Sequence, residues 1–174
     1  MNTRGVSSNR LLMVLVGIAV AGTVAGAWSF MRYARRAAPD AHRVAVAPFD
    51  IFAPGLDAWR VQLARDVTDR VATIPGWTAV PQETVALKWK GQDRAEAAAV
   101  EMARQTQAGV ALYGRVDSLG TDSVRATVLL IDVTTTIVTS AIKLRLPRST
   151  PNVLADSIIA SIQPVLVGQP KDLR

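Results

Sequence analysis

The chain has 174 residues, one histidine, no cysteine and a formal net charge of +6. The lack of cysteine excludes disulfides, a thiol nucleophile, thiolate metal sites and the lipid attachment of a bacterial lipoprotein. Residues 43–170 carry 13 Lys and Arg against 12 Asp and Glu, so the excess charge lies near the termini and we expect no nucleic-acid partner. The single histidine, His42, leaves zinc and Ser-His-Asp chemistry incomplete, and we expect it to be solvated.

An uncharged stretch, Leu11–Met31, is long enough to cross a bilayer. Its 21 residues would span roughly 31 Å as a helix, close to the ~30 Å of a hydrocarbon core. It contains Ala25-Gly26-Ala27, a pattern that signal peptidase cleaves, but its apolar character continues beyond that site. A cleaved signal usually has a shorter apolar core, of roughly 7–15 residues. We therefore expect the segment to be retained as an N-terminal transmembrane helix.

Small residues recur along one side of this predicted helix, at Ala19, Gly22, Gly26 and Ser29. Such a seam lets two helix backbones approach closely, although glycine and alanine are also simply common in membrane helices, and both interpretations stay open. Basic residues flank the helix on both sides, so charge does not decide its orientation. The residues expected to anchor it at the membrane interface are Trp28, Arg32, Tyr33, Arg35 and Arg36.

The next part of the chain predicts a strand, a helix and a second strand. Arg43–Asp50 predicts a buried strand, since Val44 and Val46 alternate with small residues, and a loop with a Pro54-Gly55 turn follows. From Leu56 to Ile74 the spacing predicts an amphipathic helix, capped by Asp57 and stopped by Pro75-Gly76. Its apolar stripe is Trp59, Leu63, Val67, Val71 and Ile74. Trp77–Val80 predicts the second strand, and Pro81–Trp89 a helical turn plus loop.

The remaining part predicts a helix, three strands and a last helix. Asp93 and Glu96 fit a capping box that opens an alanine-rich helix ending near Gln107. Three β-type runs follow, joined by turns at Gly120-Thr121-Asp122 and at Thr134-Thr135, which predicts an antiparallel meander. The runs are Val110–Leu119, Val124–Asp132 and Ile137–Leu146. The last helix is expected from Val153 to about Val167, with Asn152 as its cap, with Leu154, Ile158, Ile162 and Val165 on its apolar side, and with Pro164 bending or shortening it.

The predicted order is β-α-β-α-β-β-β-α, which indicates the α/β class. One β-α-β unit gives parallel strands and the meander adds antiparallel ones, so we expect a compact sandwich of two or three layers on a mixed, mostly antiparallel sheet. The expected organisation is a tail (1–10), the transmembrane helix (11–31), a basic linker (32–42), one α/β domain (43–168) and a C-terminal tail (169–174).

Three phrases in this order, Val44–Phe49, Gly109–Val116 and Val124–Thr135, give the domain a resemblance to a known family. They resemble the TolB N-terminal-like domain, the α/β module shared by the TolB amino-terminal domain and its FlgO and CsgG relatives. The resemblance implies a non-catalytic scaffold domain that works in assemblies at or outside the bacterial inner membrane, and it supplies no catalytic residues. The chain departs from the family in having Thr134–Thr136 where a hairpin glycine is usual, and in lacking the propeller or helical repeats that follow this domain elsewhere.

The sequence holds few candidates for chemistry. Gly109 and Gly114 stand alone, without a phosphate-binding pattern. Asp66 and Asp69, beside Arg65 and Arg70, predict surface ion pairs rather than an acid/base pair, and Asp50 at a strand end predicts a loop cap, since no second polar group is expected near it. Three tryptophans could line a pocket but fit core or interface packing better: Trp59, Trp77 and Trp89. We therefore expect no enzyme, catalytic residue, cofactor, metal or small-molecule substrate.

A transmembrane helix followed by one compact domain is similar to the layout of accessory subunits in bacterial photosynthetic or respiratory complexes. The sequence thus predicts a structural subunit of a larger membrane complex, such as a photosynthetic reaction centre–light-harvesting or a respiratory assembly, with other membrane subunits and the lipid bilayer as partners. The alternative is a periplasmic sensor or a ligand- or peptide-binding module. By the family's usual placement, we expect the chain in the bacterial inner membrane, with its N-terminus cytoplasmic and its domain periplasmic.

Overall fold

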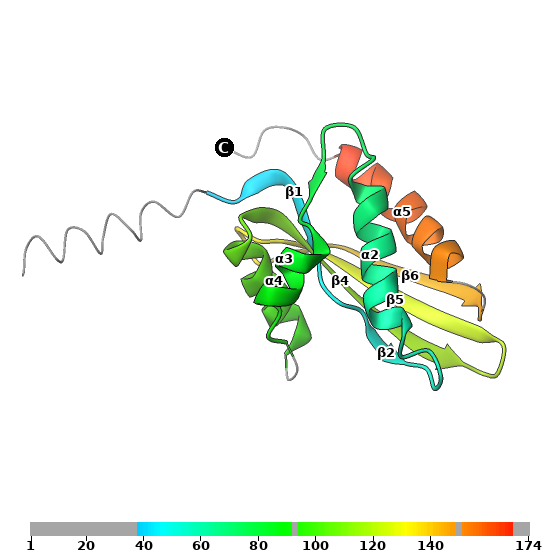
Figure 1. The fold of residues 1–174 in the computed structure, drawn as a ribbon. Helices are drawn as coiled ribbons and strands as arrows, with labels where there is room; N and C mark the ends of the chain where they lie inside the picture. The colour runs from blue at the N-terminus through cyan, green and yellow to red at the C-terminus, as the bar shows by residue number, and fades with distance from the viewer. Residues whose placement is uncertain (1–37, 92–93, 149–150, 169–174) are drawn as a thin grey trace, which may run out of the picture. The chain divides into compact units, whose positions relative to one another are not determined.

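The computed structural model describes residues 38–91, 94–148 and 151–168, in which a mixed sheet carries helices on both faces (Figure 1). The strands are β1 (Asp40–Val46), β2 (Asp50–Phe52), β3 (Thr78–Ala79), β4 (Ala108–Leu119), β5 (Ser123–Asp132) and β6 (Val138–Pro147), and the helices are α2 (Trp59–Val71), α3 (Gln82–Lys88), α4 (Ala95–Gln105) and α5 (Pro151–Gly168). The predicted α/β class and mixed sheet are confirmed. The predicted transmembrane helix, its small-residue seam and its interface anchors lie outside the described residues.

The sheet has the strand order β3-β1-β4-β5-β6. β1 lies parallel to both β3 and β4, while β4, β5 and β6 form the predicted antiparallel meander. The prediction of a loop after Asp50 was wrong, because β2 pairs in parallel with the far half of β4. This strand depends on β4, more than 60 residues away in the chain, which no local pattern reveals. The interior strand β1 is buried on both faces from Val44 to Val46, as expected for a parallel strand with helices on both sides.

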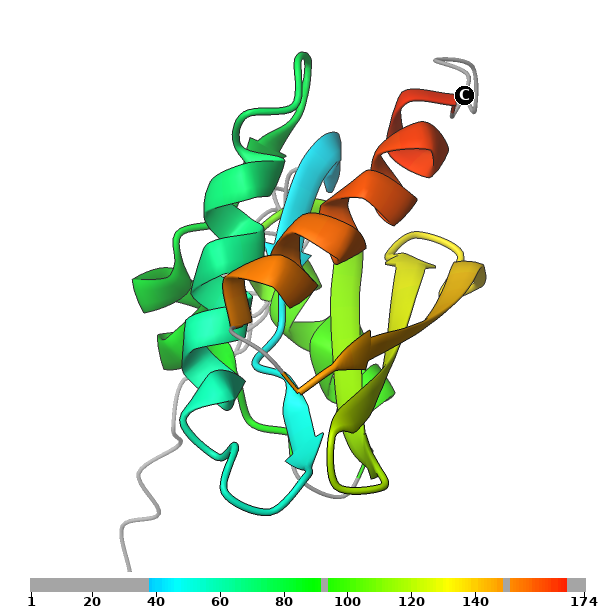
Figure 2. The same cartoon turned by 90° about the vertical axis from the view of Figure 1, so that its right-hand side faces the viewer.

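One face of the sheet is covered by α2 and α5, which lie side by side in both ribbon views (Figures 1 and 2). The predicted stripe of α2 is confirmed, because all five of its side chains are buried in this core. On α5, Leu154, Ile158 and Ile162 are buried as predicted, but Leu166 rather than Val165 completes the buried side. Burial of these apolar side chains on the sheet is the main source of stability in this layer.

The opposite face is covered in part by α3 and α4. Val85 of α3 and Met102 of α4 are buried in a second core against Ala111, Tyr113 and Ile131 of the sheet. The helical turn predicted at Pro81–Trp89 is confirmed as α3. The domain therefore has three layers, with helices on the two faces of one sheet.

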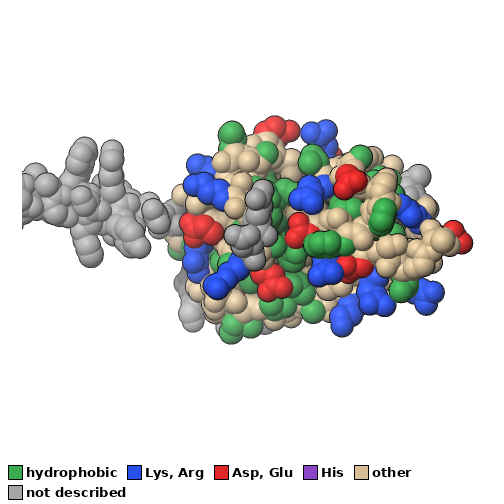
Figure 3. Space-filling model, turned by 90° about the horizontal axis from the view of Figure 1, so that it is seen from below, with side chains coloured by type: hydrophobic (Ala, Val, Ile, Leu, Met, Phe, Trp, Pro, Cys, Tyr) green, Lys and Arg blue, Asp and Glu red, His purple; other side chains and the backbone are tan. Residues whose placement is uncertain are grey.

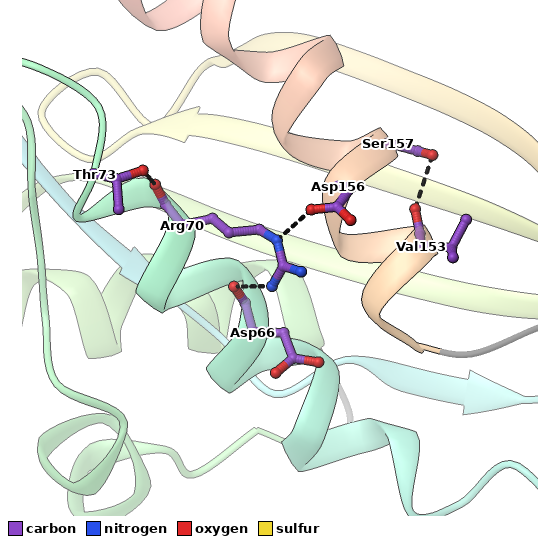
Figure 4. Close-up of polar contacts among 6 residues, drawn as sticks. All are labelled: Asp66, Arg70, Thr73, Val153, Asp156 and Ser157. Carbon is purple, nitrogen blue, oxygen red and sulfur yellow. Dashed lines mark hydrogen bonds and ion pairs between the residues drawn. The ribbon is translucent and has the colours of Figure 1, made fainter.

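The contact between α2 and α5 includes a polar bridge. Arg70 Nε of α2 donates to Asp156 Oδ1 of α5 at 2.6 Å, and Arg70 also donates to the backbone oxygen of Asp66 (Figure 4). The predicted ion pairs of Asp66 and Asp69 are absent from the described residues, because Arg70 turns toward the neighbouring helix instead. Thr73, just beyond the end of α2, donates to the Arg70 carbonyl, and Ser157 donates to the Val153 carbonyl within α5.

Several predicted helix ends were wrong. Ala58, not Asp57, precedes α2 and makes no side-chain cap, while the backbone oxygen of Asp57 accepts the N–H of Arg60. α5 already includes Asn152 and runs through Pro164. Pro164 and Ala160, whose carbonyl loses its helical partner to the proline ring, are both exposed, so water can solvate that carbonyl group.

The predicted capping box of the alanine-rich helix also differs from the structure. α4 follows Arg94, which makes no side-chain cap, and Asp93 lies outside the described residues. Glu96 is present in the first turn of α4, where a negative charge favours the helix dipole.

By length and composition, one helix among the described residues, Pro151–Gly168, could cross a membrane. Five of its side chains are nevertheless buried within the domain, against α2 and the sheet: Leu154, Ala155, Ile158, Ile162 and Leu166. Its apolar character is thus explained by its place in the core.

Candidate functional site

The helical layer of α3 and α4 stops short of the far ends of β4, β5 and β6. On β4, Ala111 and Tyr113 are buried, but Arg115 on the same side of the strand is exposed. On β5, Ile131 is buried and Arg125 is exposed. Side chains at this end of the sheet line a shallow hollow of about 510 Å³: Arg115, Asp117, Arg125, Thr127, Lys143, Leu144 and Arg145. We call the six of them other than Leu144 the open basic face.

The strand register arranges the open basic face in two rows. The first row runs Arg115, Thr127, Lys143 across β4, β5 and β6, and the second runs Asp117, Arg125, Arg145. Paired residues on neighbouring strands project to the same side of a sheet, so all six side chains share one face. Rows two residues apart are separated by roughly 7 Å along the strands.

Charge on this face is unbalanced. Arg115 forms an ion pair with Asp117 at 2.7 Å, and the hydrogen bond that the guanidinium donates to this carboxylate raises the pKa of Arg115. Arg125, Lys143 and Arg145 have no ion pair with any described residue. Figure 3 shows Lys and Arg side chains gathered at the lower right of the domain with few acidic side chains beside them. Three cations therefore remain uncompensated in a domain that is otherwise close to neutral.

Two of these cations face each other directly. Arg125 on β5 and Arg145 on β6 are cross-strand partners, and like charges in directly opposite positions destabilise a sheet. Such an arrangement gains nothing for folding, whereas it concentrates positive charge at one place on the surface. It is therefore better explained by binding than by stability.

An exposed aromatic ring lies beside the face. Phe52 of β2 is 57% exposed, and the Arg115 guanidinium stacks on its ring at 4.4 Å from the centroid. Phe52 pairs in register with Asp117 and therefore projects to the same side of the sheet. An arginine stacked on an exposed aromatic ring is a combination enriched at protein interfaces.

Asp50 lies at the inner border of this site and has two polar partners, so the prediction that none would be near it was wrong. Its Oδ2 accepts a hydrogen bond from the Tyr113 hydroxyl at 2.8 Å, and its Oδ1 lies 3.8 Å from the Arg60 guanidinium. Burial of the phenol, together with the hydrogen bond and the charge of Asp50, raises the pKa of Tyr113 far above its ordinary value. The phenol thus stays protonated and acts as a fixed donor, which suits a positioning role for Asp50 rather than acid/base catalysis.

A glycine on β4 determines how the chain reaches this site. A Cβ at Gly114 would clash with the ring of Phe49, which is fully buried between β1 and β2. The missing side chain at Gly114 therefore lets Phe49 pack on β4, and the chain then continues into β2 beside Arg115. The sequence shows Gly114 only as an isolated glycine without a motif.

The other residues that the sequence singled out lie in or on the core. Trp59 and Trp77 are buried and Trp89 is partly buried, which agrees with core packing, and Trp77 also borders a surface hollow together with His42 and Leu166. His42 is exposed and its ring lies 5.3 Å from that of Trp77. Across the described ranges, no three His, Asp or Glu side chains are grouped so that they could hold a metal ion.

The open basic face itself was not predicted from the sequence. Its signal is the alternation of charged and apolar residues in Arg115-Val116-Asp117 and Lys143-Leu144-Arg145, which indicates strands with one wet face. What brings these short patterns together is the register of β4, β5 and β6.

Comparison with solved structures defines the fold. The chain is similar to TolB from Acinetobacter baumannii (19% identity, TM-score 0.51), over 78% of this chain and 31% of the TolB chain. It is also similar to a PelC dodecamer from Paraburkholderia phytofirmans (20% identity, TM-score 0.51, 73% of this chain and 89% of that one) and to the C-terminal domain of LpoB from Salmonella enterica (14% identity, TM-score 0.52, 63% and 85%).

The chain has a TolB/LpoB-like α/β fold. No family model and no curated protein matches the sequence. At these identities the likeness concerns the fold, and the chain spans less than a third of the TolB chain that it matches.

Proposed function

We propose that this chain is a non-enzymatic, membrane-anchored accessory subunit whose TolB/LpoB-like domain binds another component of a bacterial membrane complex. The observation that carries the proposal is the open basic face, where three uncompensated cations and an exposed phenylalanine lie on bare sheet. Binding explains this surface, while the raised pKa of Tyr113 keeps its phenol protonated as a hydrogen-bond donor to Asp50.

The membrane part of the proposal comes from the sequence. In this proposal residues 11–31 stay uncleaved and form a transmembrane helix, with the N-terminus on the cytoplasmic side and the domain in the periplasm. The seam of Ala19, Gly22, Gly26 and Ser29 is to pack against a neighbouring helix, so that helix and domain make two linked contacts. We further propose that the domain belongs to the TolB N-terminal-like family and that the chain works in a photosynthetic or respiratory complex.

A second candidate function is a tethered sensor or peptide-binding module. The same surface favours it, because an open basic hollow can accept an anionic ligand as well as a subunit. The two functions differ in what stays bound: a subunit purifies in a stable complex, whereas a sensor purifies alone and gains stability when its ligand is added.

The experiment is purification from native membranes under mild detergent, followed by intact-mass measurement and identification of companions. We expect the 18.6 kDa mass of the full chain in a complex with other membrane proteins. A mature chain that begins near Trp28 would contradict the anchor, and a full-length chain that always purifies alone would contradict the subunit function.

A further inference from the structure

We propose that the open basic face receives an extended acidic segment of a partner protein, which pairs along β6 and places carboxylates opposite Lys143 and Arg145. This inference rests on the proposed function and names the chemistry of the partner.

The edge is available for another strand. β6 is ten residues long and, within the described part of the chain, pairs only with β5. The outer edge of such a strand presents unpaired N–H and C=O groups, which bind extended segments by strand addition. Proteins use charged side chains to limit such pairing, and the two cations of β6 are placed to select which strand can add.

The spacing of the cations matches an extended ligand. Lys143 and Arg145 are two residues apart on β6, so their side chains project to the same face roughly 7 Å from each other. A segment running along β6 has the same repeat, and acidic residues at every second position would meet both cations. Arg125, directly behind Arg145 on β5, adds its charge to the same place.

The intervening positions favour a protein segment over a simple anion. Ile142, Leu144 and Leu146 of β6 project to the other face and pack only partly buried against the core. A strand beside β6 could cover them with its alternate side chains. Free phosphate or a lipid headgroup would meet the cations but leave these apolar groups uncovered.

A second copy of the chain and a lipid surface fit less well. Two β6 edges brought together would juxtapose Lys143 and Arg145 with the same cations of the copy, which is repulsive. The face also lies at the end of β4 away from Asp40, where the chain enters the domain, since Asp40 pairs with Ala108 and Arg115 comes seven residues later. At about 3.3 Å per residue this separation is roughly 23 Å, so a tether entering at Asp40 does not by itself bring the face to headgroups.

The test uses the full chain in detergent and a labelled peptide of alternating glutamate and threonine. We expect binding that weakens as salt rises from ~0.05 to ~0.5 M. Lys143→Gln with Arg145→Gln should weaken it roughly 5- to 30-fold, the loss of two exposed ion pairs. Lys88→Gln with Lys90→Gln removes the same charge from exposed positions at α3 and should leave binding unchanged.

Two further arms make the outcome decisive. A peptide of the same composition with its glutamates in one block should bind more weakly, because only alternation matches β6. Lys143→Glu with Arg145→Glu should lose the glutamate peptide and bind a lysine–threonine peptide instead. Circular dichroism confirms that each variant is folded.

The proposal is overturned if the wild-type chain does not bind the glutamate peptide, or if the two glutamine double variants bind it with equal affinity. It is also overturned if phosphatidylglycerol vesicles or inorganic phosphate bind the face and the peptide does not. Self-association that depends on Lys143 and Arg145 would overturn it in favour of a second copy. Co-purification with a membrane complex is unaffected by these results, so the proposed function and this inference fail separately.

Discussion

Neutralising Arg145 should stabilise the domain while it weakens partner binding. Arg145 lies directly opposite Arg125 in the sheet and has no ion pair with any described residue. Arg145→Gln keeps a long polar side chain on the exposed strand and removes only the charge. The free energy of unfolding should therefore rise, which is the reverse of the usual effect of a substitution.

The expected gain is small and can be estimated. Two charges about 5–7 Å apart, as for directly opposite strand residues, repel in water by roughly 0.6–0.8 kcal/mol, and salt at ~0.15 M reduces this by about half. Lys143 on the same face adds to the repulsion, so a gain of about 0.3–1 kcal/mol is expected, within the range for cross-strand pairs. For a chain of this size that corresponds to a rise in Tm of about 1–4 °C.

Thermal unfolding of the full chain in detergent, followed by circular dichroism, measures this gain. It should be largest in low salt and disappear near ~1 M NaCl, where screening acts within about 3 Å. Arg115→Gln is the matched control on the same face, because it removes the ion pair with Asp117 and the contact with Phe52 and should lower Tm. A lower Tm for Arg145→Gln than for the wild type in low salt, or a rise in Tm that does not change with salt concentration, would refute the reasoning.

Three other predictions concern the fold around the site. Gly114→Ala should lower the free energy of unfolding by about 1–3 kcal/mol in urea titration, because its Cβ clashes with Phe49, and the loss should be smaller in a Phe49→Leu background. Thr136→Gly should raise Tm, because Thr136 has φ +60°, a left-handed conformation that costs a non-glycine residue roughly 1 kcal/mol; an unchanged or lower Tm would count against that strain. Tyr113 has a raised pKa in the folded chain, so its contribution to stability is complete below about pH 10 and is lost as the pH rises further. The Tm of the wild type should thus fall more steeply than that of Tyr113→Phe in alkaline solution, and parallel curves would contradict the shift.

The sequence predicted the elements that have a strong local pattern. The stripe of α2 and the alternation of β4 and β5 depend on residues close together in the chain, and they were located within a few residues. The resemblance to the TolB N-terminal-like domain likewise indicated the fold that the solved structures share. Helix caps were less predictable, since Asp57 and Asn152 are good cap residues in general but the chain begins these helices elsewhere.

The candidate site was beyond the sequence because it consists of non-local pairings. Asp50 meets Tyr113 across 63 positions of the chain, and Phe49, just ahead of β2, packs on β4 at Gly114. Arg125 and Arg145 become neighbours through the register of β5 and β6. None of these contacts has a local period, so hydrophobic patterning does not reveal them.

The most direct measurement is the recovery of partners from native membranes that carry Lys143→Glu with Arg145→Glu, compared with Lys88→Glu with Lys90→Glu. Both chains should remain in the membrane fraction, since neither change touches residues 11–31. We expect the first chain to lose its companion proteins and the second to keep them at the wild-type level. Equal recovery of companions by both chains would contradict the binding role of the open basic face.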